Sequence, residues 1–250
     1  MRMTDNTILV TGGGSGIGQA LAWQFAKRGN VVIVAGRTEE SLAETAADHD
    51  NIHTQVLDVA DEASVEECAE RMKRDFPKIN MLIHAAGIMR LRDTGDMDLA
   101  RKIIDINLLG TMRICEAFIP LLSGKPGATI CTTSSGLAFV PMPVAPAYSA
   151  SKAGVHSFSL QLRQRLKGDI EVIEIAPPAV QTGLTEGQET REGYMPLDDY
   201  IEETMANFEK DPTPSENLVK NVLPFRNAER EGKVEDRQDM LARMVAQREG

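Results

Sequence analysis

The sequence predicts a single α/β domain built on a doubly wound parallel sheet of six or seven strands. Short β-branched runs alternate along the chain with longer stretches that have helical periodicity. Several of these runs are apolar almost throughout, which is typical of parallel strands covered by helices on both faces. The length of 250 residues suits one such domain better than two.

The predicted strands and helices alternate in the order expected of repeated βαβ units. The strands are expected at residues 7–10, 31–35, 53–57, 81–83, 128–132 and 170–175. The crossover helices are expected at residues 16–28, 39–47, 62–76, 98–122 and 147–167. This order indicates a Rossmann-like fold, in which ligands bind beyond the carboxyl ends of the strands.

The last third of the chain has a different character. Residues 177–214 are interrupted by glycine and proline, so we expect a loop-rich segment whose part at 183–215 could act as a substrate lid. Residues 226–250 are dense in charge with a narrow apolar stripe, which predicts a charged C-terminal helix. No obvious seventh strand stands out in this part.

Composition excludes several classes of function. The formal net charge of -10 disfavours nucleic-acid binding, because that affinity depends on clustered Lys and Arg. No apolar run is long enough to insert into a membrane, and no signal peptide is evident, so a cytoplasmic protein is expected. Three well-separated cysteines predict neither a disulfide framework nor a zinc site, and no metal is expected.

A glycine-rich turn joins the first predicted strand to the first helix. Residues 11–18 read TGGGSGIG, and glycines at such a turn let the backbone approach a pyrophosphate at the helix N-terminus. The turn does not contain GxGxxG, and it is no Walker A loop because Gln19 stands where Lys is required. It matches the pattern TGxxxGxG and favours a dinucleotide over ATP.

The end of the second strand bears on the choice of cofactor. An NAD-binding fold usually offers an acidic residue there to the adenosine ribose. This chain has Gly36 followed by Arg37, and a guanidinium suits a 2′-phosphate. We therefore predict that NADP(H) is preferred over NAD(H), the alternative being that Arg37 is an ordinary solvated arginine.

A tyrosine and a lysine stand four residues apart in a predicted helix. Tyr148 and Lys152 would lie on one helix face, where the ammonium, helped by an oxidised nicotinamide, would favour the phenolate. Ser135 follows the fifth strand, where a hydroxyl can hold a substrate oxygen. Asn107 is a polar residue in an apolar helical stretch and is either part of this site or a hydrogen-bonded core residue.

Taken together, TGxxxGxG, Asn107, Ser135 and YxxxK resemble the short-chain dehydrogenase/reductase family over roughly residues 7 to 182. The resemblance implies that Tyr148 exchanges a proton with the substrate oxygen and that Ser135 orients that oxygen. It also implies that Lys152 lowers the tyrosine pKa and contacts the nicotinamide ribose, and that Asn107 holds a proton-relay water. Stretches 135–142 and 175–178 are similar to the subgroup described as DltE-like.

The same resemblance implies a set of cofactor-binding residues. Asp58 and Val59 would contact adenine, and residues 177–182 would hold the carboxamide. The full implied set is Gly12, Ser15, Gly16, Ile17, Gly18, Arg37, Asp58, Val59, Ala86, Gly87, Tyr148, Lys152, Pro178, Val180 and Thr182. Two positions depart from the family: Ala85 replaces a usual Asn that braces the sheet, and Pro178 replaces a usual Gly.

The resulting hypothesis is an enzyme that interconverts a small-molecule ketone or aldehyde and an alcohol by hydride transfer. The alternative is a redox sensor that binds NADP(H) without turnover. Helices 98–122 and 147–167 commonly form the subunit interface in relatives, so a homodimer or homotetramer is expected. His156, one turn beyond Lys152, is interpreted as a helix-packing histidine.

Overall fold

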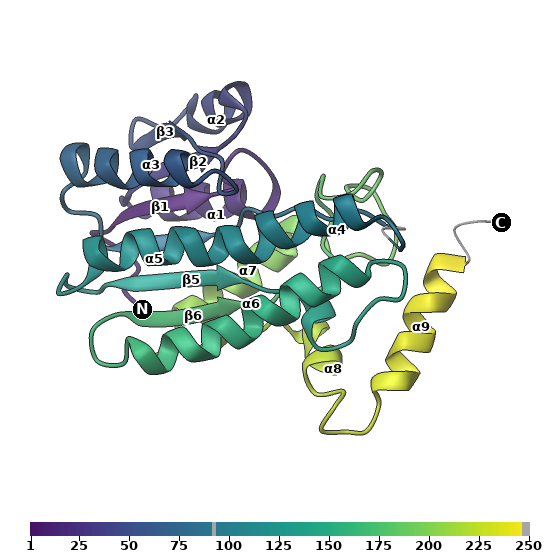
Figure 1. The fold of residues 1–250 in the computed structure, drawn as a ribbon. Helices are drawn as coiled ribbons and strands as arrows, with labels where there is room; N and C mark the ends of the chain where they lie inside the picture. The colour runs from purple at the N-terminus through teal and green to yellow at the C-terminus, as the bar shows by residue number, and fades with distance from the viewer. Residues whose placement is uncertain (92–93, 247–250) are drawn as a thin grey trace.

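A seven-stranded parallel sheet in the order β3-β2-β1-β4-β5-β6-β7 forms the centre of the molecule, which is a computed structural model described over residues 1–91 and 94–246 (Figure 1). The strands are β1 Thr7–Thr11, β2 Val31–Gly36, β3 Ile52–Val56, β4 Met81–His84, β5 Thr129–Thr133, β6 Glu171–Ile175 and β7 Glu216–Asn217. The doubly wound parallel sheet is therefore confirmed. The third strand begins at Ile52, one residue before its predicted start, and the buried Ile52 pairs with Val32.

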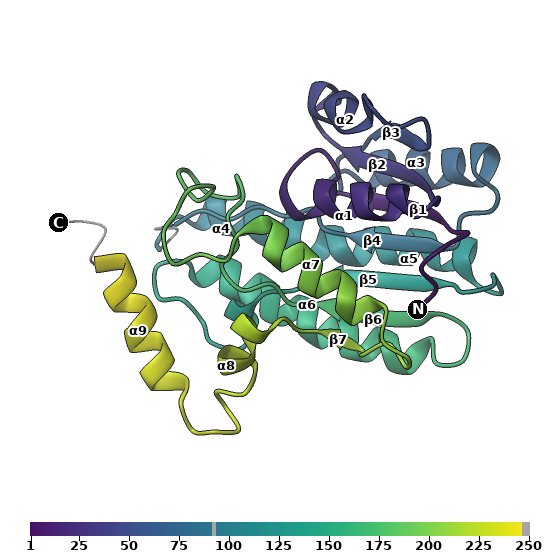
Figure 2. The ribbon, with the colours of Figure 1, turned by 180° about the vertical axis from the view of Figure 1, so that it is seen from behind.

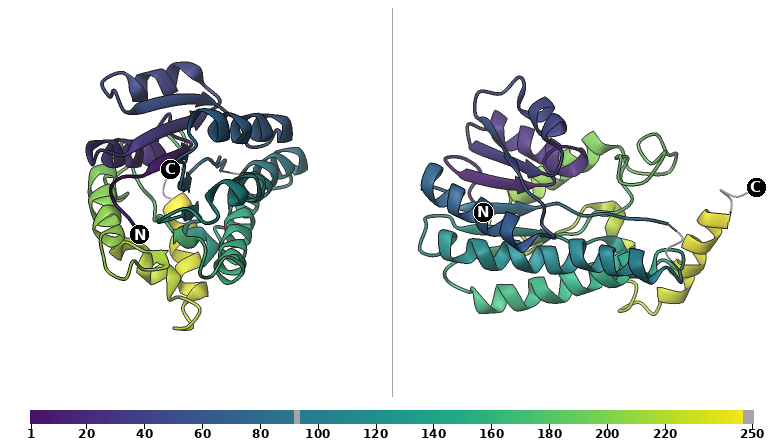
Figure 3. Two further views of the ribbon diagram at one scale, coloured as in Figure 1. Left: turned by 90° about the vertical axis from the view of Figure 1, so that its left-hand side faces the viewer. Right: turned by 45° about the horizontal axis from the view of Figure 1, so that its top comes forward.

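Helices cover both faces of this sheet (Figures 2 and 3). The α-helices are α1 Gly16–Lys27, α2 Glu39–Ala46, α3 Glu62–Asp75, α4 Met97–Ile104, α5 Gly110–Leu122, α6 Pro146–Arg165, α7 Leu197–Phe208, α8 Leu223–Arg226 and α9 Val234–Ala246. Apolar residues of α1 and α7 form the core on one face, and those of α3, α5 and α6 form it on the other. In β1, Ile8 and Val10 join the first core whereas Leu9 joins the second, as the pleat requires.

The helix predicted over residues 98–122 is interrupted by one wider turn. After α4, residues Asp105–Leu109 form a π-helical segment, and α5 follows directly. The Asp96 side chain caps the start of α4 by accepting a hydrogen bond from the Leu99 amide at 2.9 Å. The π segment contains Asn107, and such bulges are frequent at functional sites.

The C-terminal part corrects two sequence predictions. Residues 177–214 include α7, whose buried Tyr200, Ile201 and Phe208 pack on the sheet, so only part of this segment is loop. The chain then adds β7 beside β6, a pairing of two residues that is too short to recognise by periodicity. The helix predicted over 226–250 is α9, which begins at Val234 after a series of turns; residues 247–250 of that prediction lie outside the described residues.

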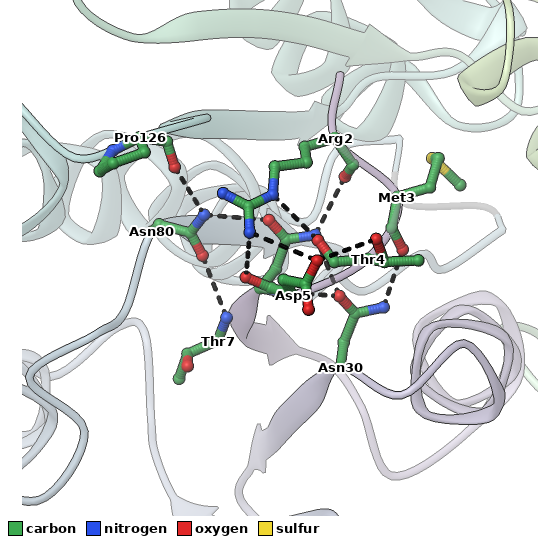
Figure 4. A network of polar contacts seen from close by, with 9 residues as sticks. Arg2, Met3, Thr4, Asp5, Thr7, Asn30, Asn80 and Pro126 are labelled. Atoms are coloured by element: carbon green, nitrogen blue, oxygen red, sulfur yellow. Dashed lines mark hydrogen bonds and ion pairs between the residues drawn. The ribbon is translucent and has the colours of Figure 1, made fainter.

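A network of asparagines ties together the amino ends of the central strands (Figure 4). Asn30 Oδ1 accepts a hydrogen bond from the Asn6 amide at 2.9 Å, and Asn80 Oδ1 accepts one from the Thr7 amide at 3.0 Å. Asn80 Nδ2 also donates to Asn6 Oδ1 and to the Pro126 carbonyl. These buried bonds hold β1, β2 and β4 in register at the edge of the sheet opposite the candidate site.

Two further findings concern the hydropathy of the helices and the state of the cysteines. Across residues 1–91 and 94–246, no helix combines the length and hydropathy needed to span a bilayer. Cys68, Cys115 and Cys131 are free and buried, and burial raises the pKa of the Cys68 thiol to about 12. Such thiols remain protonated and unreactive at neutral pH.

Candidate active site

A groove runs across the carboxyl edge of the sheet, where β1, β4 and β5 end. It consists of two adjoining cavities of about 180 and 300 Å³, which share Gly12, Ser15 and residues 86–88. All fifteen residues of the implied cofactor set line one or both of these cavities. The fold thus brings the whole set to the place where doubly wound sheets bind ligands.

The glycine turn forms the floor of this groove. Gly12 has φ +68°, and a Cβ there would lie 2.8 Å from the Ala86 amide nitrogen. A Cβ at Gly18 would lie 2.3 Å from the Gly12 carbonyl oxygen, so this position admits no side chain. Ser15 precedes α1 without capping it through its side chain, which leaves the first amides of α1 available to an anion.

The smaller cavity contains the residues that are predicted to contact the adenosine part of the cofactor. Arg37, Asp58 and Val59 line it together with residues from the glycine turn. The hydroxyl-bearing Thr38 and Ser41, at the start of α2, line it as well, and sequence reasoning missed them. The signal was available, because Thr38 directly follows Arg37 and occupies the N-cap position of a helix.

The larger cavity contains the predicted acid/base residues. Tyr148 and Lys152 extend from α6, while Ser135 lies just after β5 and accepts a hydrogen bond from the Leu137 amide at 3.2 Å. Tyr148 is 6% exposed and Lys152 is 5% exposed. Pro178, Val180 and Thr182 form the opposite wall after β6. Arg90 and Gln188 also line this cavity and were not predicted.

Burial dominates the electrostatics of Tyr148 in this structure. Burial raises the pKa of Tyr148 to about 12, and a hydrogen bond from Ser135 offsets only part of this effect. Lys152 Nζ lies over the Tyr148 ring, 5.7 Å from its centroid. Desolvation therefore outweighs the Ser135 hydrogen bond and favours the neutral phenol.

Lys152 is held by the end of β5. Its Nζ donates to the Thr133 carbonyl at 2.8 Å, and burial lowers the pKa of the ammonium to about 8. A Cβ added at Gly87 would lie 3.5 Å from this Nζ and 3.3 Å from Asn107 Oδ1. Gly87 therefore keeps open the space that Lys152 and Asn107 both face.

Asn107 is completely buried and fully hydrogen-bonded. Its side chain accepts from the Ile88 amide at 2.8 Å and donates to the Ile88 carbonyl at 2.9 Å and to Ser151 Oγ at 3.1 Å. It thereby joins the loop after β4 to α6, one residue before Lys152. Asn107 lines neither cavity of the groove, so its observed contacts are those of a residue that positions its neighbours.

The strand end that carries Ala85 is braced by other groups. His84 Nδ1 forms a hydrogen bond with Thr11 Oγ1 at 2.7 Å, and Thr133 Oγ1 donates to the His84 carbonyl at 2.7 Å. Burial lowers the pKa of His84 to about 3, and the Lys152 charge adds to this effect, so the ring is neutral. These bonds link β1, β4 and β5 where the family usually has an asparagine amide.

A polar cluster that the sequence did not reveal lies behind Ser135. The buried Glu174 of β6 accepts a hydrogen bond from Ser134 Oγ, and His156 Nδ1 lies 2.8 Å from Glu174 Oε2. Ligand atoms of His156, Glu174 and Glu216 lie within 4.8 Å of one another, but Glu216 is paired in a bidentate manner with Arg226. His156 also packs edge-on against Phe139, so it combines the predicted packing role with an ion pair.

Comparison with known proteins agrees with this geometry. A sequence profile of the family described as short chain dehydrogenase matches residues 6–193. The protein named uncharacterized oxidoreductase DltE from Bacillus subtilis is 41% identical over 198 residues, which cover 77% of this chain and 79% of the relative. Sulfoacetaldehyde reductase 2 from Chromohalobacter salexigens is 35% identical over 189 residues, covering 72% and 75% of the two chains.

Solved structures share the fold over nearly the whole chain. A short chain dehydrogenase from Burkholderia cenocepacia in complex with NADP superposes with a TM-score of 0.80 at 23% identity, covering 98% of this chain and 99% of the other. A short chain dehydrogenase/reductase from Burkholderia phymatum in complex with NAD gives a TM-score of 0.81 at 21% identity, covering 94% and 96%. Neighbours of this fold thus bind either nicotinamide cofactor.

Proposed function

The chain belongs to the short chain dehydrogenase family of oxidoreductases, and we propose that it reduces a ketone or aldehyde, or oxidises the corresponding alcohol, with NADP(H) as the preferred cofactor. The observation that carries this proposal is the position of Tyr148 and Ser135. Both line the larger cavity of the groove, and both also line a further, mainly apolar cavity of about 450 Å³. Their hydroxyls therefore lie where cofactor and substrate would meet.

The groove fits a dinucleotide in shape and chemistry. The uncapped N-terminus of α1 would receive the pyrophosphate, and Asp58 and Val59 would flank the adenine. Pro178, Val180 and Thr182 would hold the carboxamide, and Lys152 would contact the nicotinamide ribose. When bound there, the cofactor supplies the hydride that adds to the carbonyl carbon and is itself oxidised.

The protein's own residues handle the proton. The pKa of about 12 keeps Tyr148 protonated at neutral pH, so in the reductive direction the phenol donates its proton to the carbonyl oxygen and the alcohol is formed. Ser135 holds that oxygen by a hydrogen bond. The Lys152 ammonium then lies 5.7 Å from the ring centroid and stabilises the phenolate until solvent returns a proton.

Arg37 supports the preference for NADP(H). It is exposed at the mouth of the adenosine cavity, and the hydroxyls of Thr38 and Ser41 line the same cavity. The last residue of β2 is Gly36, so this position has no carboxylate that would repel a 2′-phosphate. A guanidinium beside hydroxyl groups is a favourable environment for a phosphate dianion.

The test compares wild type with Tyr148→Phe. NADPH binding is followed by its fluorescence, and turnover by loss of absorbance with a panel of ketones and aldehydes. We expect the variant to bind NADPH as wild type does and to lose roughly a hundredfold or more in kcat, since general acid catalysis is removed. If wild type binds NADPH but consumes it with no member of the panel, the protein is a cofactor-binding sensor instead.

A further inference from the structure

The third cavity leads away from the reacting hydroxyls and is lined mainly by apolar side chains, the polar ones beyond Ser135 and Tyr148 being Thr185, Gln188, Tyr194 and Asn221. It begins at Ser135 and Tyr148, has a volume of about 450 Å³, and extends to α9. None of the described residues that line it is Asp, Glu, Lys, Arg or His. Its volume lies within the range of about 300–1,000 Å³ that is usual for small-molecule sites.

Methionines supply much of the wall. They are Met89, Met142, Met195, Met240 and Met244. Methionine has an unbranched, polarisable side chain that adapts to ligands of different shape. These five residues come from four separate parts of the chain, so the wall is assembled only in the folded protein.

The C-terminal helix α9 lines the far end of this cavity. Figures 1 and 2 show α9 beyond the carboxyl edge of the sheet, away from the helices that cover the sheet faces. Leu241 is 6% exposed and packs in a cluster that also contains Tyr148 and Met142. Gln238 Nε2 donates to the Pro141 carbonyl at 3.2 Å and fastens the helix to the loop that precedes α6.

Arg90, Arg191 and Arg237 lie near this cavity, but none of them lines it. Arg191 Nη2 donates to the Glu186 carbonyl at 2.9 Å, and its guanidinium lies 5.3 Å from the Tyr194 ring centroid. Arg90 and Arg191 line a neighbouring cavity that Met89 also lines, and Arg90 Nη1 donates to the Met89 carbonyl. An anionic group at the α9 end would contact thioethers and leucine rather than a cation in the lining, and its desolvation there is unfavourable.

Resting on the proposed carbonyl chemistry, we propose that the substrate is an uncharged carbonyl compound whose aliphatic body fills the methionine-lined cavity as far as α9. Anionic carbonyl compounds of the same length are disfavoured. The apolar body sets the affinity, and Ser135 and Tyr148 set the position of the carbonyl oxygen.

The first experiment measures kcat/KM with NADPH for methyl ketones from 2-butanone to 2-decanone and for 9-oxodecanoate. We expect kcat/KM to rise with each added methylene, by roughly fourfold while the cavity fills. We also expect 2-decanone to exceed 9-oxodecanoate, its carboxylate analogue, by at least tenfold. A flat series, or a preference for the carboxylate, would overturn the proposal.

The second experiment changes the far wall. Met244→Lys places an ammonium at the α9 end, and it is expected to lower kcat/KM for 2-decanone by at least tenfold and to reduce the ratio of 2-decanone to 9-oxodecanoate. Ala242→Lys adds the same charge to an exposed position of α9 and should leave both values unchanged. Equal effects of the two variants would contradict a role for α9 in binding the aliphatic body.

A binding measurement separates this inference from the reaction itself. Calorimetry of 2-butanone, 2-decanone and 9-oxodecanoate with NADPH-saturated Tyr148→Phe reports affinity without turnover. If the affinity of the variant rises with chain length but wild type reduces none of these ketones, the proposed reaction is overturned and the cavity assignment is supported. Reduction by wild type without a dependence on length would do the reverse, and absence of both would refute both.

Discussion

The carboxylate of Glu174 and the imidazole of His156 form an ion pair next to Ser134, the residue before Ser135. Glu174 is completely buried in β6, and His156 lies one helical turn beyond Lys152 in α6. The same carboxylate accepts a hydrogen bond from Ser134. The pair therefore connects the acid/base helix, the sixth strand and the serine-bearing loop.

This ion pair predicts a stability that depends on pH. The hydrogen bond to Glu174 raises the pKa of His156 above its usual value of about 6.5. The stabilisation is therefore fully present below the unfolded-state pKa and is lost as pH rises through the higher folded-state pKa. His156→Gln should lower the free energy of unfolding by about 2 kcal/mol at pH 6 and by less at pH 9.

Urea denaturation of both proteins at the two pH values measures this difference. His53→Gln, at an exposed position of β3, serves as the control and should show the same small effect at both pH values. Glu216 and Arg226 also face His156, so their mutual pairing must persist in the variant. A loss for His156→Gln that is equal at pH 6 and pH 9 would argue against the ion pair.

The end of β2 predicts that cofactor preference can be altered. Arg37→Ala should lower kcat/KM for NADPH by roughly tenfold to a hundredfold, the value of a charged hydrogen bond, and should leave kcat/KM for NADH nearly unchanged. Gly36→Asp should raise the NADH-to-NADPH ratio further. A Cβ at Gly36 would meet only Leu42 Cδ2 at 3.6 Å, so the aspartate fits without displacing the backbone.

Steady-state kinetics with both cofactors checks this prediction. Arg101→Ala removes an equally cationic side chain from an exposed position on α4 and should not change either kcat/KM. If Arg37→Ala affects NADPH and NADH to the same extent, Arg37 is an ordinary surface arginine.

Exposed leucines on α6 and on the π-helical segment predict self-association. Leu160 of α6 is 46% exposed, and Leu109 of the π-helical segment is 41% exposed. We expect wild type to sediment as a dimer or tetramer and Leu160→Asp to reduce its mass, because a buried carboxylate would be unpaired in the interface. Leu223→Asp, on α8, provides a control with a similarly exposed leucine, and a monomeric wild type would refute the expectation.

Much of the site could be predicted because local sequence determines it. The glycine turn requires residues without side chains wherever the backbone approaches a ligand or another strand, and Gly12 and Gly18 meet that requirement in the structure. Tyr148 and Lys152 face one cavity because four residues make about one turn of helix. Neither inference needs knowledge of distant contacts.

Other properties depend on residues far apart in the sequence. The pKa of Tyr148 is raised because surrounding chain segments remove water from it, which a YxxxK pattern does not reveal. Likewise, β7 consists of two residues whose strand character comes from pairing with β6. The ion-pair partner of His156, Glu174, lies in β6, 18 residues away.

The sequence by itself determined the doubly wound sheet and predicted residues that the structure brings to one groove, since periodicity, glycine spacing and helix geometry act over a few residues. Only the tertiary structure decided that α9 lines the far end of a methionine-rich cavity and that Glu174 pairs with His156. Burial and long-range contacts arise when separate elements pack, and their energies depend on neighbours that no local pattern specifies.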